Sequence, residues 1–377
     1  MTFNRRDFGK TALAGAPALA GLSLGGLALP RFAGAATAAS SKFGGVQVGM
    51  ITYSLRQGVA KADIIPAMVK MGISSVELMS GDAEALAGAP AMPGFGGGRG
   101  PGGFGGRGRG PVADAPNGCP VNTPSGQFSQ AEANKAAGTA PVGGGGRGRG
   151  PATPEMLEAQ AKLKEWKAAA NAATWAGVRK QFNDAGIELR VLCYNMNVNS
   201  TNDDEIEYAF QMAKGLGVRA MSCSTTVAMA KKVAPFADKH KLMFGGHGHA
   251  DVHDPEQFAK PETFEQIMGF SKYIGVNLDI GHFTAAGYDP LPFIAKHHGR
   301  ITNLHLKDRT KPDKCEVSPN VVWGTGDTPI KDVLLTMKKQ KYDFPANIEF
   351  EYAIPEGSDA VTEVAKCFEF CKKILTA

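Results

Sequence analysis

Three absences restrict what this 377-residue chain can be. Its six cysteines include no CxxC pair, so their spacing requires no disulfide framework and indicates no structural zinc site. The net charge of +5 does not demand a nucleic-acid partner. After the N-terminal region, no segment of the sequence is long and apolar enough to span a bilayer. A hydrophobic fraction of 43% with 20% charged residues is instead typical of a globular protein with a substantial core.

The first 38 residues have the pattern of an export signal. The twin arginine Arg5-Arg6 precedes Phe8, a mildly apolar stretch follows, and Ala36-Thr-Ala38 offers a small-x-small cleavage site. This pattern resembles a twin-arginine signal, a route that carries proteins already folded. An N-terminal membrane anchor is the alternative, and it is disfavoured because Gly and Pro interrupt a weakly hydrophobic stretch. We therefore expect a periplasmic or secreted protein with a signal over residues 1–38.

A second unusual segment covers residues 87–153. It contains Gly/Arg repeats at 94–110 and 143–150 and is otherwise rich in Pro, Ala, Ser and Asn. Such a composition buries too little apolar area to offset the entropy of ordering, so the sequence predicts a disordered insertion. Gly/Arg tracts can also bind RNA or other anions, which is the functional alternative. In an exported protein we favour a solvated loop.

The rest of the chain alternates between strand and helix patterns. Each of eight expected strands is followed by an expected helix, and no nucleotide-binding Gly motif follows the first strand. This repetition favours one closed (β/α)₈ TIM barrel over residues 46–377, with the insertion after the second strand, rather than an open doubly wound sheet. The expected strands are 46–53, 75–79, 187–193, 218–223, 241–246, 276–280, 301–306 and 346–351. The expected helices are 63–71, 154–185, 204–216, 226–240, 261–273, 290–298, 330–339 and 359–375.

Polar side chains recur at the ends of the later strands. Along residues 301–308, Asn303, His305 and Lys307 share one face, while two leucines occupy the other. A lone histidine in such a strand would be an ordinary core or surface residue. Comparable groups end three other strands, however, and the carboxyl ends of barrel strands meet at one face. The full set is His247, His249, Asp279, His282, His305, Lys307, Glu349 and Glu351.

A site of imidazoles and carboxylates without cysteine suits one divalent ion among Mn²⁺, Co²⁺, Fe²⁺ and Zn²⁺. The order and spacing of the motifs resemble the sugar phosphate isomerase/epimerase family, the xylose-isomerase-like TIM barrels. The resemblance covers about residues 46–377 apart from the insertion. The matching stretches are Met71-Gly-Ile-Ser-Ser-Val-Glu77, His247-Gly-His249, Leu278-Asp-Ile-Gly-His282, His305-Leu-Lys-Asp308, Gly324-Thr-Gly-Asp-Thr328 and Glu349-Phe-Glu351.

The resemblance implies a metal held by one residue from each of the last four strands. Carried over, the ligands become His247, Asp279, His305 and either Glu351 or Glu349. Both glutamates are expected to face inward, and we favour Glu351 as the ligand and Glu349 as a base. The epimerases of the family use Glu where this chain has His247, and that departure argues against ketose 3-epimerase chemistry.

Such a site supports proton abstraction next to a sugar carbonyl, because a bound metal polarises the carbonyl and stabilises the enediolate. Candidates for moving the proton are Glu349, His249, His282 and Lys307. Glu77, His249 and Lys307 are expected to contact the sugar. For Glu77 the alternative is an ion pair with a Lys or Arg of a neighbouring strand.

The leading hypothesis is therefore a metal-dependent sugar or keto-sugar isomerase or epimerase with a small-molecule substrate. A lyase or hydratase that cleaves 3-keto-glycosides by β-elimination starts from the same enolate. A non-catalytic carbohydrate-binding barrel is a second alternative. Nucleic-acid repair ranks low, because the early strands offer mainly Glu77 as a further ligand. We expect no nucleic-acid partner and no stable membrane span, and the sequence leaves the oligomeric state open.

Overall fold

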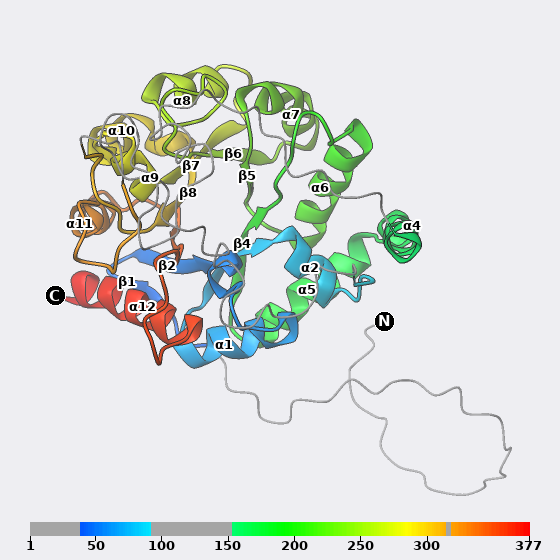
Figure 1. Ribbon diagram of the computed structural model, residues 1–377, viewed down its shortest axis with the longest axis horizontal. Helices are drawn as coiled ribbons and strands as arrows, with labels where there is room; N and C mark the ends of the chain where they lie inside the picture. Colours follow the sequence, from blue (N-terminus) through cyan, green and yellow to red (C-terminus); the bar gives the residue numbers. More distant parts are fainter. Residues whose placement is uncertain (1–37, 92–152, 314–317) are drawn as a thin grey trace, which may run out of the picture. The chain divides into compact units, whose positions relative to one another are not determined.

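Eight parallel strands close into a barrel in the computed structural model, which describes residues 38–91, 153–313 and 318–377 (Figure 1). The strands pair in chain order, and the first and last of them pair with each other to close the ring, with Val48 opposite Ala346. A short antiparallel strand, β1 (Lys42–Phe43), precedes the ring. The barrel strands are β2 (Val46–Ile51), β3 (Ser75–Met79), β4 (Glu188–Cys193), β5 (Ala220–Ser224), β6 (Met243–His247), β7 (Ile274–Asp279), β8 (Ile301–Leu306) and β9 (Ala346–Ile348). The predicted TIM barrel is confirmed.

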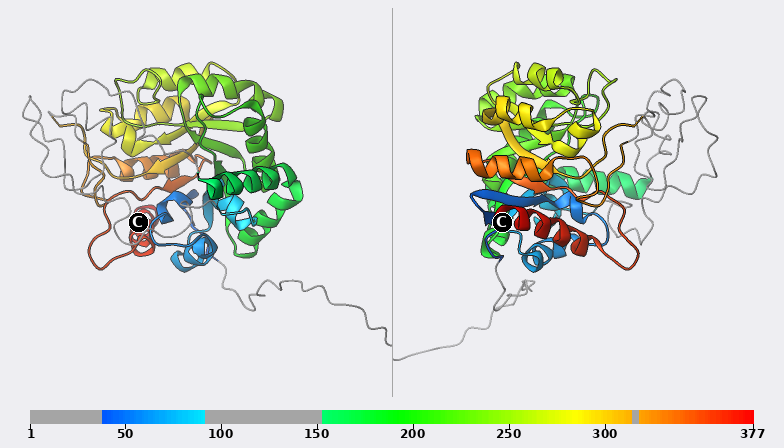
Figure 2. Two further views of the ribbon diagram at one scale, coloured as in Figure 1. Left: turned by 45° about the vertical axis from the view of Figure 1, so that its right-hand side comes forward. Right: turned by 90° about the vertical axis from the view of Figure 1, so that its left-hand side faces the viewer.

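Helices surround the strands, and their apolar sides complete the core (Figure 1). From the side, α11 and α12 lie next to each other along the barrel (Figure 2). The helices are α1 (Ile64–Met71), α2 (Ser80–Leu86), α4 (Pro154–Ala169), α5 (Ala172–Asp184), α6 (Asp203–Leu216), α7 (Val227–His240), α8 (Pro261–Met268), α9 (Ile280–Ala285), α10 (Pro290–His297), α11 (Ile330–Gln340) and α12 (Ala360–Thr376). Three 3₁₀ turns cover Thr52–Leu55, Lys61–Asp63 and His298–Arg300.

Local sequence signals determine where several of these helices begin and end. The side chains of Asn202 and Asp359 accept hydrogen bonds from the first turns of α6 and α12. Gly217 ends α6 with a φ of 69°, a left-handed conformation that glycine adopts without strain. Asp279 at the end of β7 accepts from the His282 backbone N–H at 2.7 Å and so begins α9. One side chain of the site therefore also fixes the chain direction after its strand.

Besides shifts of one or two residues at several element ends, the prediction differs from the structure in the following ways. Helix 154–185 is two helices, because Asn171 and Thr174 form a capping box that starts α5. The helix predicted to reach residue 273 ends at Met268, before Gly269. The short helices α2 and α9 were not predicted, since each begins directly at the end of a strand. The last strand ends at Ile348 rather than at residue 351.

Two predicted segments lie largely outside the described residues. The predicted export signal covers residues 1–38, and the description begins at residue 38. The predicted insertion covers residues 87–153, of which 92–152 are not described. Within the described ranges, no helix has the length and hydropathy needed to cross a membrane. The four cysteines that these ranges contain, Cys193, Cys223, Cys367 and Cys371, are buried and free.

The loop after β8 is held by one carboxylate. The side chain of Asp308 accepts hydrogen bonds from the backbone N–H groups of Gly324 at 2.8 Å, Gly326 at 3.0 Å and Thr328 at 3.3 Å. A Cβ atom at Gly326 would overlap this carboxylate, so glycine is needed there. The Gly-Thr-Gly-Asp-Thr motif thus folds around Asp308.

Replacing Asp308 with alanine should reduce the free energy of unfolding by about 2–3 kcal/mol, because it leaves partly buried N–H groups without an acceptor. Urea denaturation of the purified variant measures this loss. Asp327→Ala is the matched control, since its exposed carboxylate on the same loop accepts from the Lys311 N–H. We expect a change of about 0.5 kcal/mol or less in the control. Equal losses in the two variants would contradict the assigned role of Asp308.

Candidate metal centre and active site

Four side chains from the last four strands converge at the carboxyl end of the barrel. His247 ends β6, Asp279 ends β7, His305 lies in β8, and Glu349 follows β9 directly. One potential ligand atom from each residue lies within 4.8 Å of the others, and all four residues are buried. The Nδ1 atom of His305 lies 2.8 Å from Oε2 of Glu349. The register of the strands explains this convergence, since Asp279 pairs with His305.

The donor set fits a divalent cation. Each of the four side chains has one buried atom without a hydrogen bond of good geometry within the described part of the chain, and these atoms are Nδ1 of His247, Oδ2 of Asp279, Nδ1 of His305 and Oε2 of Glu349. Two of them, Oδ2 of Asp279 and Oε2 of Glu349, are ion-paired with Lys307 instead. A buried polar atom without a hydrogen bond is costly unless another partner satisfies it. Two imidazoles and two carboxylates suit Zn²⁺, Mn²⁺, Co²⁺ or Fe²⁺.

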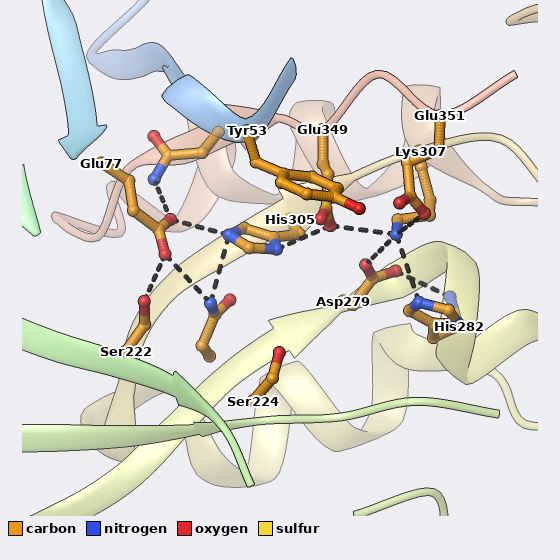
Figure 3. A network of polar contacts seen from close by, with 12 residues as sticks. Tyr53, Glu77, Ser222, Ser224, Asp279, His282, His305, Lys307, Glu349 and Glu351 are labelled. Atoms are coloured by element: carbon orange, nitrogen blue, oxygen red, sulfur yellow. Dashed lines mark hydrogen bonds and ion pairs between the residues drawn. The ribbon is translucent and has the colours of Figure 1, made fainter. Parts of the chain in front are cut away.

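Lys307 brings a positive charge to the same place. Its side chain is 2% exposed, and its ammonium lies 3.0 Å from Asp279, 2.9 Å from Glu349 and 2.7 Å from Glu351 (Figure 3). Burial alone lowers the pKa of Lys307, but these carboxylates raise it above its usual value. The carboxylates therefore favour the charged form of Lys307, and its role in proton transfer stays a prediction. A Cβ atom at Gly281 would overlap the lysine side chain, which explains the glycine in the Asp-Ile-Gly-His motif.

Asp279 and Glu349 share this cation, and their pKa values separate. For Glu349, burial raises the pKa, but Lys307 and His305 hold it well below the usual range. For Asp279, burial is the larger effect and raises the pKa to about 7. The pair therefore offers one firmly ionised carboxylate and one that is harder to ionise.

The structure places Glu349, not Glu351, beside the other three candidate ligands. Glu351 is 20% exposed, and its carboxylate lies against Lys307 and 3.9 Å from Arg56. The preference for Glu351 as the fourth ligand does not fit this arrangement. The physical reason is that the ladder of β9 ends at Ile348, and Glu349 is still hydrogen-bonded to Leu306 of β8 through its backbone N–H at 2.9 Å. Glu351, the next residue whose side chain faces inward, lies nearer the solvent.

His249 and His282 line the mouth of the site beside His247. Their rings are 5.1 Å apart, and the His249 ring is 5.0 Å from that of His247. The three histidines form a second group whose ligand atoms lie within 4.8 Å of one another. Cations surround His282, however, because Lys307 contacts its Nε2 at 3.2 Å and Arg309 its Nδ1 at 2.6 Å. Burial and Lys307 lower the pKa values of both His249 and His282, so both are neutral imidazoles at neutral pH.

Glu77 lies inside the barrel, beside the Nε2 atom of His305, whereas Glu349 lies beside the Nδ1 atom. The side chain of Glu77 is 0% exposed, and its Oε2 lies 2.7 Å from Nε2 of His305 (Figure 3). Its other partners are the side chains of Ser222, Asn277, Asn303 and Asn347. Neither the predicted contact with a sugar nor the alternative ion pair with a Lys or Arg fits this position, because polar side chains of the barrel enclose the carboxylate.

Sequence reasoning missed two groups at the mouth. The half-buried ring of Tyr53 stands beside the site (Figure 3), and Arg56 lies 4.1 Å from its centroid. Burial, Glu351 and Glu349 raise the pKa of Tyr53, against the effect of Arg56, so its hydroxyl remains a neutral donor. Arg309 also donates to the Ser318 carbonyl at 2.8 Å. Both could have been found from position alone, since Tyr53 ends the first predicted strand and Arg309 follows the His-Leu-Lys-Asp motif.

Comparisons with known proteins agree with this architecture. The model of one family, described as the xylose isomerase-like TIM barrel, matches residues 153–373. A search among curated protein sequences finds no match.

Solved structures with the same fold share little sequence with this chain. The probable 3-DHS dehydratase AsbF of Bacillus anthracis has a TM-score of 0.52 at 11% identity, with 88% of this chain and 99% of that chain covered. A xylose isomerase domain-containing protein of Salmonella typhimurium has a TM-score of 0.51 at 10% identity, with 89% and 99% covered. These structures support the fold alone. Because the family model matches more than half of its length, the chain belongs to the xylose isomerase-like TIM barrel family.

Proposed function

We propose that the protein is a divalent-metal-dependent enzyme that isomerises or epimerises a sugar or keto-sugar by proton abstraction next to a carbonyl. The observation that carries this proposal is the convergence of His247, Asp279, His305 and Glu349, which are all buried and each bring one potential ligand atom within 4.8 Å of the others. When bound there, a divalent ion polarises a sugar carbonyl and stabilises the negative charge of an enediolate.

Lys307 is the proposed proton donor of the site. Three carboxylates surround its ammonium, and these contacts keep the charged form. A cation in a buried site stabilises negative charge that develops on a substrate oxygen. The neighbouring carboxylates hold its proton until a more basic oxygen appears. Lys307 thus suits the transfer of a proton to oxygen rather than its removal from carbon.

His249 is the proposed base. It is half-buried and neutral, and it lies at the open end of the site, whereas cations contact both ring nitrogens of His282. A neutral imidazole can take a proton from the carbon next to a carbonyl. Replacement of His249 should therefore remove turnover while leaving the four candidate metal ligands in place.

The substrate that we propose carries no phosphate. The backbone N–H groups of Gly324, Gly326 and Thr328, which could bind a phosphate, already donate to the carboxylate of Asp308. The predicted export signal supports the same choice, because it would place the enzyme in the periplasm or outside the cell.

Solvent exchange tests the proposal even though the sugar is unidentified. Protein loaded with Mn²⁺, Co²⁺, Fe²⁺ or Zn²⁺ is incubated in D₂O with a panel of unphosphorylated aldoses and ketoses. We expect deuterium to enter the C–H bond next to the carbonyl of one sugar class, as seen by NMR. Chelator-treated protein and the His305→Ala variant are the controls, and both should lose the exchange. A wild-type protein that binds no divalent ion would overturn the proposal.

The products decide between isomerisation and the competing chemistry. An epimer or isomer supports the proposal as stated, whereas free aglycone from a 3-keto-glycoside would identify a lyase that uses the same first proton transfer. Sugar binding with bound metal but without exchange would indicate a carbohydrate-binding barrel that has lost catalysis.

A further inference from the structure

The carboxylate of Glu77 lies directly beneath His305 and is surrounded by hydrogen-bond donors. Its Oε2 atom lies 2.7 Å from Nε2 of His305, on the side of the ring opposite the metal group. Four further side chains from strands β5, β7, β8 and β9 contact it. They are the Ser222 hydroxyl and the amide nitrogens of Asn303 at 2.8 Å, Asn347 at 2.9 Å and Asn277 at 3.4 Å. All five contacts reach the carboxylate as possible donors.

This arrangement determines which nitrogen of His305 carries a proton. A carboxylate that accepts every one of its hydrogen bonds cannot lie 2.7 Å from the bare lone pair of a ring nitrogen. Nε2 must therefore carry a hydrogen. Asn277 also contacts Nε2, at 3.1 Å, through its amide nitrogen, while its Oδ1 atom has no partner within the described ranges. Turning this amide over would place an acceptor beside the Nε2 hydrogen and remove the long 3.4 Å contact with Glu77. Glu77 would keep four possible donors, from His305, Ser222, Asn303 and Asn347, so the tautomer would be unchanged.

With Nε2 committed to Glu77, His305 has only Nδ1 for any other ligand. That atom faces Oε2 of Glu349, one of the four candidate metal ligands, at 2.8 Å, so a bound ion would take the place of a proton on Nδ1 while Nε2 keeps its own. The ring of His247 lies 4.7 Å away on the same side. The two sides of the imidazole therefore differ: Glu77 and its partners lie on one side of the ring, and Glu349, Asp279 and Lys307 lie on the other (Figure 3).

We propose that Glu77 is the positioning residue of the metal centre: its carboxylate holds the Nε2 hydrogen of His305 and so presents Nδ1 to the ion. This inference rests on the proposed function, because it requires that an ion binds. A carboxylate behind a metal-binding histidine fixes the ring orientation and makes the free nitrogen more basic. Glu77 acts through His305 and does not contact the substrate.

A purely structural role makes a different prediction. The interior of a TIM barrel is usually filled by apolar side chains, so a buried carboxylate with five polar neighbours could serve only to satisfy the asparagines. In that case its replacement would lower stability and leave metal affinity unchanged. The two roles are therefore separated by comparing metal affinity with stability.

The test uses Glu77→Gln, Glu77→Leu and, as the matched control, Ser222→Ala in the full chain. Ser222 belongs to the same buried layer and donates to Glu77, but it does not contact His305. Dissociation constants for Zn²⁺ and Co²⁺ are measured by competition with a chromophoric chelator, and folding is followed by circular dichroism. We expect Glu77→Gln to weaken binding about 10–100-fold and Glu77→Leu to weaken it more, because only glutamine keeps an acceptor for Nε2–H. Ser222→Ala should stay within about threefold of the wild type, and the visible spectrum of bound Co²⁺ should change only in the Glu77 variants.

The possible results separate the role of Glu77 from the proposed function of the protein. Wild-type affinity in folded Glu77→Gln, or an equal loss in Ser222→Ala, would overturn the role of Glu77 alone. A wild-type protein that binds neither ion would overturn the proposed function, and this inference with it. If the Glu77 variants do not fold, a crystal structure of the Zn²⁺-loaded wild type decides, since an ion on Nδ1 of His305 supports the inference and an ion on Nε2 overturns it.

Discussion

The Glu349→Gln variant is expected to lose more than about 100-fold in affinity for Zn²⁺ and Co²⁺, while Glu351→Gln keeps wild-type affinity. Loss of a carboxylate that binds the ion directly should exceed the 10–100-fold effect of outer partners. Glu349 is buried and grouped with His247, Asp279 and His305, whereas Glu351 lies against Lys307. Isothermal titration of both variants with each ion measures the difference.

The two substitutions are closely matched, because they make the same chemical change two residues apart on the same segment. Metal analysis of the purified variants should agree with the titrations. If Glu351→Gln loses the ion and Glu349→Gln retains it, the ligand set that we derive from the structure is wrong and the preference for Glu351 that the sequence suggests is right.

The Lys307→Met variant is expected to lower the rate of solvent exchange into the sugar by about 10²–10⁴-fold while binding metal at least as tightly as the wild type. Activity falls because the proposed proton donor is gone. Metal binding does not weaken, because the ammonium lies 3.0 Å from Asp279 and 2.9 Å from Glu349 and repels any ion that these carboxylates hold. Removing the cation also leaves buried carboxylates without compensation, so the metal-free variant should lose about 3–5 kcal/mol of stability.

Thermal unfolding with and without Zn²⁺ checks the predicted loss of stability. Zn²⁺ should stabilise Lys307→Met more than it stabilises the wild type. Lys311→Met serves as the control, because Lys311 is exposed and lies four residues further along the same loop. Exchange at the wild-type rate in Lys307→Met would show that Lys307 only balances charge and does not transfer a proton.

Much of the architecture could be predicted from the sequence, because it depends on local signals. Strand and helix patterns alternate clearly, and residues such as Asn202 and Gly217 mark where a helix begins and ends. The alternation of Asn303, His305 and Lys307 correctly placed these side chains on the inner face of one strand. The strand order then brought His247, Asp279 and His305 together, although the sequence contains no distances between them.

Other features depend on contacts between distant segments, which a single sequence does not contain. The choice between Glu349 and Glu351 turns on where the ladder of β9 ends, because both face inward by alternation. Burial of Glu77 depends on asparagines supplied by β7, β8 and β9, from 200 to 270 residues away. Likewise, the carboxylates that favour the charged form of Lys307 belong to other segments, Asp279 at the end of β7 and Glu349 and Glu351 after β9, so the sequence alone does not reveal that they surround it.

The closing strand has a further consequence for how the protein matures. β9 has only three residues, pairs with β2 on one side and β8 on the other, and is followed immediately by Glu349. During synthesis the barrel therefore remains open, and the proposed ligand set lacks one carboxylate, until the chain has been made past Glu349. An ion that prefers the complete set binds the closed ring more strongly than any open intermediate, and so favours closure in proportion to that difference in affinity. Ring closure and metal uptake would then be one linked event, completed by the last strand.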